Sequence, residues 1–208
     1  GVPDAARVAY LGLYALQHRG QESAGIVAVT PDGESRIRVG MGLVSETFDD
    51  AELEKLPGDV AVGHTRYSTT GSTVLANAQP CLVNYRAGSL SVAHNGNLTN
   101  AAELKEELFR EDLRHINTES DSEVLLNVFA HELEQAGKLT LAPDDIFRAV
   151  SAVHRRCRGA YAVTLLIVGF GLLAFRDPHG IRPLVYGKRQ TDAGPEHIFA
   201  SESVALDV

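Results

Sequence analysis

The sequence predicts an α+β fold, a four-layer αββα sandwich in which antiparallel sheets are stacked between layers of helices. Segments typical of strands come first, helical segments follow, and strands return after Gly159, with connections that suit hairpins better than parallel βαβ units. The run AYAVTLLIV, residues 160–168, is apolar on both sides of the strand alternation, so both of its faces should be covered. Stacked sheets between helical layers satisfy that requirement.

The composition is that of one globular domain. The 208 residues are enough to bury a core, and 44% of them are hydrophobic and 22% charged. The formal charge of -8 argues against a nucleic-acid-binding surface, because such a surface needs clustered Lys and Arg. The longest apolar stretch, residues 160–175, is shorter than the ~20 residues that a membrane-spanning helix needs.

Cysteine content and the start of the sequence indicate the cell compartment. The two cysteines, Cys81 and Cys157, are too few for a disulfide framework or a zinc site, and no secretory signal peptide opens the sequence. We therefore expect a cytoplasmic protein. We expect this chain to bind no metal ion or other cofactor, and to have neither nucleic acid nor membrane as a partner.

The first half of the chain is predicted to contain one helix and four strands. Pro3 precedes an apolar helical pattern and Gly20 follows it, which predicts a helix over residues 3–18. Pro31-Asp32-Gly33 is a turn signal that predicts a hairpin between the first two strands. The predicted strands are residues 24–29, 37–40, 59–64 and 90–94. The long polar segment between the last two is predicted to be a loop with a function.

Three helices and four strands are predicted in the second half. Asn100 and Ser120 each stand three residues before a Glu, in the pattern of a capping box, and each should begin a helix. A third helix is predicted over residues 143–156. The predicted strands are residues 160–168, 172–176, 184–186 and 198–200.

The stretch SVAHNGNLTN, residues 91–100, allows two interpretations. Asn95-Gly96-Asn97 has the composition of a tight hairpin turn, since Asn and Gly tolerate a positive φ. A backbone N–H beside an Asn carboxamide, in a bend that a substrate can approach closely, is also what an oxyanion hole requires. This stretch alone does not separate the two.

Four polar motifs together resemble one family. They are LQHRGQESAG (residues 16–25), GHTRYSTTG (63–71), AHNGNLTN (93–100) and TESDSE (118–123). Their order and spread resemble the type 2 glutaminase domain of the glutamine amidotransferases, whose nucleophile is an N-terminal cysteine. The resemblance runs from about Asp4 to the end of the sequence and includes DPHGIRPL (177–184) and FASES (199–203). It implies an N-terminal-nucleophile hydrolase fold over residues 1–208.

The resemblance also implies roles for individual residues. Arg66 matches the arginine that holds the substrate carboxylate, and Asp121 matches the carboxylate that receives its ammonium group. Asn95 and Gly96 match the oxyanion pair, which favours the second interpretation of SVAHNGNLTN, with the turn as the means of aiming the N–H. In the resembling family Arg19 and Gly20 lie beside the nucleophile, where we assign them a positioning role.

Three further expectations concern the same region. His64 and His94, each at the end of a strand, are expected to be structural histidines, and Asp177 to Pro183 a structural turn. By analogy with closing loops that exclude water, residues 66–79 are predicted to form a lid over glutamine. Cys81 and Cys157 are expected to be small buried hydrophobic residues rather than nucleophiles.

The family pattern extends beyond both ends of the sequence. It has a cysteine and a short apolar strand before the first helix, whereas this sequence begins Gly1-Val2-Pro3-Asp4, so the nucleophile is expected ahead of Gly1. Within the family, the sequence is most similar to the branch that supplies ammonia to phosphoribosyl pyrophosphate for purine synthesis. That similarity implies a phosphoribosyltransferase domain after Val208, with Mg²⁺ and in some members an iron-sulfur cluster, and a homo-oligomer, a tetramer.

Two alternatives remain open at this point. One is the glutaminase domain of another amidotransferase, of the type found in glucosamine-6-phosphate synthase, asparagine synthetase or glutamate synthase. The other is a glutamine-binding regulatory module that performs no catalysis. The identity of the N-terminal residue of the mature protein separates this module from an enzyme, because only the enzyme needs the cysteine.

Overall fold

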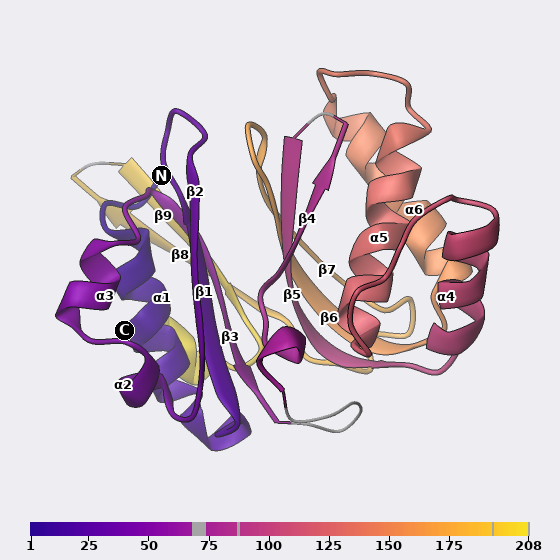
Figure 1. The fold of residues 1–208 in the computed structure, drawn as a ribbon. Helices are drawn as coiled ribbons and strands as arrows, with labels where there is room; N and C mark the ends of the chain where they lie inside the picture. The colour runs from indigo at the N-terminus through magenta and orange to yellow at the C-terminus, as the bar shows by residue number, and fades with distance from the viewer. Residues whose placement is uncertain (68–73, 87, 193, 208) are drawn as a thin grey trace.

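The computed structural model describes residues 1–67, 74–86, 88–192 and 194–207. Two antiparallel sheets pack face to face, and helices cover the outer face of each (Figure 1). The four-layer αββα sandwich predicted from the sequence is confirmed.

The first sheet has the strand order β2-β1-β3. Its strands are β1 (Ser23–Val29), β2 (Ser35–Met41) and β3 (Val60–Arg66). The central strand lies antiparallel to both neighbours, so that Val27 faces Ile37 on one side and Val62 on the other. The helices on the outer side of this sheet are α1 (Ala5–Ala15), α2 (Val44–Thr47) and α3 (Asp50–Glu54). A small apolar core, which includes Ile26 and Phe48, joins these helices to the sheet.

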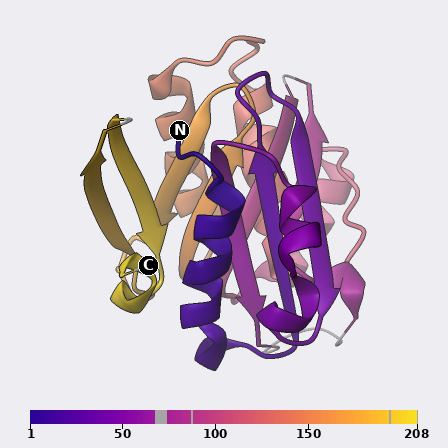
Figure 2. The same cartoon turned by 90° about the vertical axis from the view of Figure 1, so that its left-hand side faces the viewer.

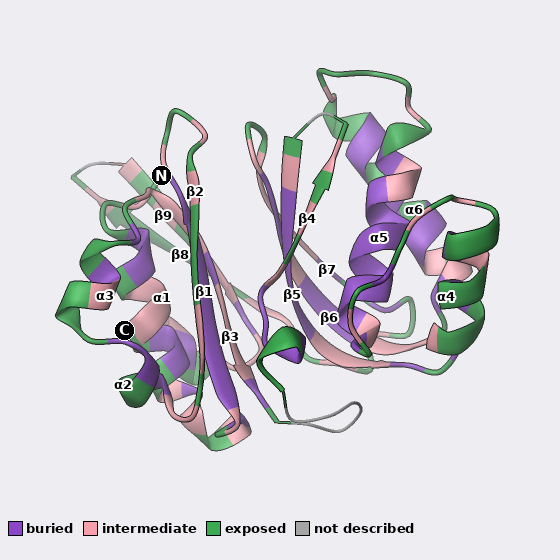
Figure 3. Cartoon of the chain, in the orientation of Figure 1, coloured by how far each residue is buried: buried purple, intermediate pink, exposed green. Residues whose placement is uncertain are grey.

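The second sheet has the order β4-β5-β6-β7. Its strands are β4 (Cys81–Tyr85), β5 (Gly88–Leu98), β6 (Gly159–Ile167) and β7 (Gly171–Arg176). The helices on its outer side are α4 (Ala101–Arg110), α5 (Asp121–Glu134) and α6 (Pro143–Arg156). The larger core lies here, with Phe129, Leu125 and Tyr161 fully buried (Figure 3).

The space between the two sheets is also apolar. Val27 and Val62 from the first sheet meet Ala93 and Leu166 from the second. Leu165, the neighbour of Leu166 in β6, belongs to the core on the helical side. This strand is therefore covered on both faces, as its apolar sequence predicts.

A separate hairpin follows the two large sheets. It consists of β8 (Val185–Thr191) and β9 (Gly194–Ala200), and it lies beside α1 (Figure 2). The short helix η3 (Ser203–Leu206) follows it, and Ala205 packs with Ala200 and Leu16. Two further short helices are η1 (Gln17–Arg19) and η2 (Leu75–Asn77).

The predicted turn at Asn95-Gly96-Asn97 is wrong. The three residues lie inside β5 and face Ala162, Tyr161 and Ala160 of β6. Gly96 has a φ of 151°, and a Cβ there would lie 2.0 Å from the carbonyl oxygen of Ala160. Glycine is thus required here by the close approach of the neighbouring strand. Because glycine is also typical of turns, the sequence pattern wrongly predicted a turn.

The segment predicted to be one long loop is shorter than expected. β4 lies within it and pairs with β5, and η2 precedes β4. Of the lid predicted over residues 66–79, residues 68–73 lie outside the described residues.

Both predicted helices begin where expected, but neither uses the predicted capping box. The Asn100 side chain binds the Arg156 carbonyl and the Arg158 N–H, both at 2.9 Å, and so ties α4 to the end of α6. Ser120 accepts a hydrogen bond from Ser122 N at 3.3 Å, whereas Glu123 accepts from the backbone of Asn117 and Thr118. Asn100 thus uses tertiary partners, whereas Ser120 caps α5 without the reciprocal bond from Glu123.

Candidate active site

One cavity of about 860 Å³ brings together five of the six residues predicted to form the site. Arg19, Arg66, Asn95, Gly96 and Asp121 all line it, although they come from η1, β3, β5 and α5. The sixth, Gly20, packs against the backbone of Arg66. The cavity has room for a small polar molecule and for additional polypeptide.

Arg66 is the last residue of β3 and is buried, with an exposed fraction of 6%. Its Nη1 forms an ion pair with the carboxylate of Glu22. A Cβ on Gly20 would lie 2.5 Å from the carbonyl carbon of Arg66, so only glycine lets the chain after η1 approach this closely. Glu22 holds the Arg66 guanidinium in place, and Gly20 lets the backbone after η1 lie against the backbone of Arg66. Both residues therefore have a positioning role.

Arg19 is held in place by a residue near the C-terminal end of the sequence. Its guanidinium forms an ion pair with Glu202, which also accepts a hydrogen bond from His18 Nε2 at 2.9 Å. The hydrogen bond from Arg19 lowers the pKa of the Glu202 carboxyl, and the bond from His18 acts in the same direction. Glu202 belongs to the FASES motif, so this ion pair explains why that motif stands with the others.

The hydrogen-bonding direction of β5 decides which peptide groups face the cavity. Odd-numbered residues pair with β6, because Thr99 N donates to Arg158 O at 2.8 Å and Ser89 O accepts from Val168 N at 3.1 Å. Backbone groups alternate in direction along a strand, so those of His94, Gly96 and Leu98 point to the opposite edge. On that edge β4 ends at Cys81, opposite Val92.

Gly96 N–H therefore points to an edge of β5 that the neighbouring strand no longer covers. Two residues further on, Leu98 N donates to Asp121 Oδ2 at 2.9 Å from the same edge. The Nδ2 of Asn95 is buried and has no hydrogen-bond partner among the described residues. A backbone donor and a side-chain donor thus stand beside the cavity, and two donors are what an oxyanion hole requires.

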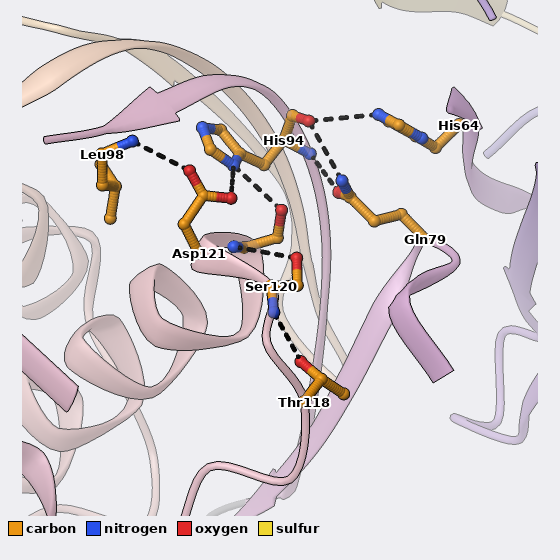
Figure 4. Close-up of polar contacts among 8 residues, drawn as sticks. His64, Gln79, His94, Leu98, Thr118, Ser120 and Asp121 are labelled. Atoms are coloured by element: carbon orange, nitrogen blue, oxygen red, sulfur yellow. Dashed lines mark hydrogen bonds and ion pairs between the residues drawn. The ribbon is translucent and has the colours of Figure 1, made fainter. Parts of the chain in front are cut away.

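Asp121 is held at the start of α5, with its side chain only 13% exposed. Ser120 N donates to Thr118 Oγ1 at 3.1 Å, which fixes the chain that leads into the helix. The bond from Leu98 N takes one carboxylate oxygen, and the other lies 3.7 Å from His94 Nδ1 (Figure 4). The carboxylate is therefore fixed by both the helix and the strand.

His64 and His94 both line the cavity, and each uses one ring nitrogen in a hydrogen bond within the fold. His94 Nδ1 lies 3.0 Å from Ser122 Oγ, and burial lowers the pKa of this histidine. His64 Nε2 lies 3.1 Å from the His94 carbonyl oxygen, and burial lowers its pKa to about 4. Both imidazoles are therefore neutral at pH 7 and act as hydrogen-bonding groups in the wall of the site.

Other residues of the site were missed by the sequence analysis. Glu22 and Glu202 stand in two of the quoted motifs, but the sequence assigns them no partner. Gln79, which binds the His94 backbone, is marked by no motif. Arg182 lines the cavity from the segment predicted to be a structural turn. That turn is confirmed, because Asp177 accepts hydrogen bonds from the backbone N–H groups of His179 and Ile181.

The described ranges contain no group of three or more His, Cys, Asp or Glu side chains that could hold a metal ion. In the same ranges no helix has the length and apolar character needed to cross a membrane.

Comparison with known proteins gives consistent matches. The family profile described as "Glutamine amidotransferase domain" matches residues 64–208. The amidophosphoribosyltransferase of Pseudomonas aeruginosa is 53% identical over 199 residues, which are 96% of this chain and 39% of that protein. The amidophosphoribosyltransferase of Escherichia coli is 50% identical over 208 residues, which are 100% of this chain and 41% of that protein.

A solved structure gives the same match in three dimensions. The glutamine phosphoribosylpyrophosphate amidotransferase of B. subtilis superposes with a TM-score of 0.81 at 39% sequence identity. The match covers 100% of this chain and 42% of that one. The chain thus spans about two fifths of the length of the relatives that it matches.

Proposed function

The chain belongs to the family of glutamine amidotransferase domains, and from this premise we propose that it is the glutaminase half of an amidophosphoribosyltransferase. In this role it hydrolyses glutamine to glutamate and ammonia. The ammonia then converts phosphoribosyl pyrophosphate to phosphoribosylamine, the first step of de novo purine (IMP) biosynthesis. The observation that carries the proposal is the convergence of Arg66, Asn95, Gly96 and Asp121 on one cavity.

The charges of the site fit free glutamine. The Arg66 guanidinium offers donors for the α-carboxylate, and the Asp121 carboxylate offers acceptors for the α-ammonium group. With these two ends held, the side-chain amide reaches toward Asn95 and Gly96. An amino acid with a short side chain would leave the two donors without a partner, which supports selection for glutamine.

The reaction that we propose needs a nucleophile, which we place in a cysteine at the start of the mature chain, ahead of Gly1. Its thiolate attacks the amide carbon, and the amide oxygen becomes an oxyanion that accepts hydrogen bonds from Gly96 N–H and Asn95 Nδ2. The α-amine of the cysteine carries a proton to the leaving ammonia. Water then hydrolyses the thioester and releases glutamate.

The cavity supports this position for the nucleophile. It extends along β3 from Gly1 and Asp59 at one end to Arg66 at the other, and Val2 N donates to Asp59 O at 2.6 Å. Among the described residues β3 is the outer strand of its sheet, so its free edge can accept another strand. Seven residues preceding Gly1 would extend about 23 Å along that edge and bring the first of them to Arg66.

The chain's own cysteines are poor substitutes. Burial raises the pKa of both thiols to about 12, so neither forms a thiolate at neutral pH. Cys157 is buried in the core on the helical side, and Cys81 packs against the same core from β4. Neither lines the cavity.

The partners of the whole protein follow from the same proposal. We place the binding of phosphoribosyl pyrophosphate and Mg²⁺, together with any iron-sulfur cluster, in a phosphoribosyltransferase domain after Val208. We further propose a cytoplasmic homo-oligomer, a tetramer.

The proposal is tested by comparing two forms of the glutaminase half, one starting at Gly1 and one extended at the N-terminus to the expected cysteine. Each is incubated with glutamine, and separately with a glutamine-mimicking alkylating analogue. We expect the extended form alone to release glutamate and to be labelled at its first residue. Equal glutamate release by the Gly1 form, or labelling of Cys81 or Cys157, would contradict the proposal.

A second assay identifies the ammonia acceptor. The full-length protein is given glutamine with either phosphoribosyl pyrophosphate or fructose 6-phosphate. We expect release of pyrophosphate with the first and no amino sugar with the second. The opposite result would favour a glucosamine-6-phosphate synthase type, and binding of glutamine without hydrolysis would favour a regulatory module.

A further inference from the structure

The ladder between β4 and β5 stops just before the oxyanion donors. Cys81 faces Val92, and the same register continued by two residues would place Gln79 opposite His94. β4 begins only at Cys81, however, and Pro80 separates it from Gln79. The backbone groups of His94 nevertheless need partners, because His94 is buried with an exposed fraction of 3%.

The Gln79 side chain supplies those partners. Its Oε1 accepts from His94 N at 2.8 Å, and its Nε2 donates to His94 O at 3.3 Å (Figure 4). A carboxamide has one acceptor and two donors, so it reproduces both hydrogen bonds that a peptide group in a neighbouring strand would make. The side chain thus takes the place of one residue of β4.

The Gln79 backbone has turned toward the other sheet. A Cβ on Gly25 of β1 would lie 2.2 Å from the Gln79 carbonyl oxygen, so the backbones of these two segments are in contact there. Gln79 is itself buried, with an exposed fraction of 6%. The residue therefore joins the two sheets at the level of the cavity, which it also lines.

A second side chain acts on the same carbonyl. His64 Nε2 lies 3.1 Å from His94 O, and because a carbonyl only accepts, this nitrogen must carry the proton. The His94 carbonyl and the Asn95 N–H belong to one peptide group, which leads directly into Gly96. Two donors from separate elements thus fix the plane of the peptide that precedes the oxyanion pair.

We propose that Gln79 is a positioning residue for the oxyanion hole. Its side chain holds both peptide groups of His94, so that the donors of Asn95 and Gly96 stay aimed at the reacting oxygen. This inference rests on the proposed glutaminase function. Gln79 acts before and during the reaction without touching the substrate. Its loss should therefore misdirect the donors and leave glutamine bound by Arg66 and Asp121.

The experiment uses the full-length protein and two variants of Gln79. Gln79→Met keeps the size and removes both hydrogen bonds, whereas Gln79→Glu keeps the acceptor for His94 N and loses the donor to His94 O. Ser91→Ala is the matched control, because buried Ser91 also binds the β4 backbone, from its Oγ to Cys81 O at 3.1 Å, but lies three residues before His94. Turnover is expressed per site labelled by the alkylating analogue, so that unfolded protein does not count.

We expect Gln79→Met to lower kcat for glutamine about 10- to 100-fold, since small misplacements near the chemistry have effects of this order. The KM should change less than threefold. The kcat of Gln79→Glu should lie between that of Gln79→Met and that of the wild type. An aldehyde analogue of glutamine forms a tetrahedral adduct with the cysteine, so its inhibition constant should rise by the same factor as kcat falls. Inhibition by glutamate should not change.

Two kinds of result would contradict the proposal. If both Gln79 variants keep the wild-type kcat, Gln79 has no role in aiming the donors. The same holds if the inhibition constants of glutamate and the aldehyde rise by equal factors. If Ser91→Ala loses as much turnover as Gln79→Met, the effect belongs to the β4–β5 pair in general. A wild-type protein that does not hydrolyse glutamine would overturn the proposed function, and this inference with it.

Discussion

At the residue scale, Arg66 and Asp121 carry the charges that we assign to the two ends of the substrate. Arg66→Lys and Asp121→Asn should each raise the KM for glutamine about 10- to 100-fold with a smaller change in kcat, because these contacts are the same before and during the reaction. Asn at position 121 keeps an acceptor for Leu98 N, so the start of α5 should be preserved. The measurement is steady-state glutaminase kinetics, with exposed Arg36→Lys as the control.

The reverse pattern would contradict these roles. If Arg66→Lys lowered kcat and left KM unchanged, the arginine would serve the chemistry and the assignment of the carboxylate clamp would fail.

Asn95 should show the opposite kinetic behaviour. Asn95→Ala removes a donor that matters most when the oxyanion forms, so we expect kcat to fall about 100- to 1000-fold with little change in KM. Asn84→Ala, at the far end of the β4–β5 pair, removes an exposed hydrogen bond to Ser89 and is the control. A large rise in KM for Asn95→Ala, with kcat retained, would place this side chain in ground-state binding.

At the scale of elements, Gly20 determines how closely η1 approaches β3. In Gly20→Ala the new Cβ would meet the backbone of Arg66 at 2.5 Å, which the chain can relieve only by moving Arg66. We expect a lower Tm and a several-fold higher KM for glutamine. Gly12→Ala in α1 is the matched control, because its nearest atoms lie 3.7 Å away and alanine favours a helix.

Thermal unfolding and kinetics of the two variants decide this prediction. Gly20→Ala with wild-type Tm and KM would mean that the approach of η1 to Arg66 does not position the arginine.

The elements also show what a single sequence can predict. The helix predicted over about residues 143–156 is confirmed, since Pro143 marks its start and a basic turn its end. Asn95-Gly96 was misread because its local chemistry suits a turn, whereas pairing with β6 makes it a strand. Gln79 was missed because its role depends on where two strands stop in space, which no local pattern records.

The roles of Arg66, Asp121, Asn95 and Gly96 came from the order of four motifs, and the structure brings all four residues to one cavity. The pairing of Glu22 with Arg66 and of Glu202 with Arg19 could not be predicted from the sequence, because ion pairs between distant segments follow from the fold.

At the scale of the whole molecule, the half-buried His64 links stability to pH. Burial lowers the pKa of His64 from 6.5 to about 4. Between these two pH values the unfolded chain binds a proton that the folded chain does not. The free energy of unfolding is therefore not reduced by His64 above about pH 6.5, and it falls as the pH drops toward 4. We expect His64 to account for a loss of about 2 kcal/mol between pH 7 and pH 5.

Urea unfolding at the two pH values measures this loss. His64→Gln keeps a donor near His94 O and does not titrate, so its stability should fall by about 2 kcal/mol less than that of the wild type. His115→Gln, at an exposed position, is the control and should behave as the wild type does. Equal pH dependence in all three proteins would contradict the assignment to His64.

We propose that glutamine lies between Arg66 and Asp121 with its amide oxygen at Asn95 and Gly96, which line the same cavity. The most direct test is a crystal structure of the extended protein after reaction with a glutamine-mimicking alkylating analogue. We expect a covalent bond to the N-terminal cysteine, the α-carboxylate on Arg66, the α-ammonium on Asp121, and the former amide oxygen within hydrogen-bonding distance of Gly96 N and Asn95 Nδ2. An adduct whose oxygen points away from both donors, or whose charged ends bind elsewhere, would contradict it.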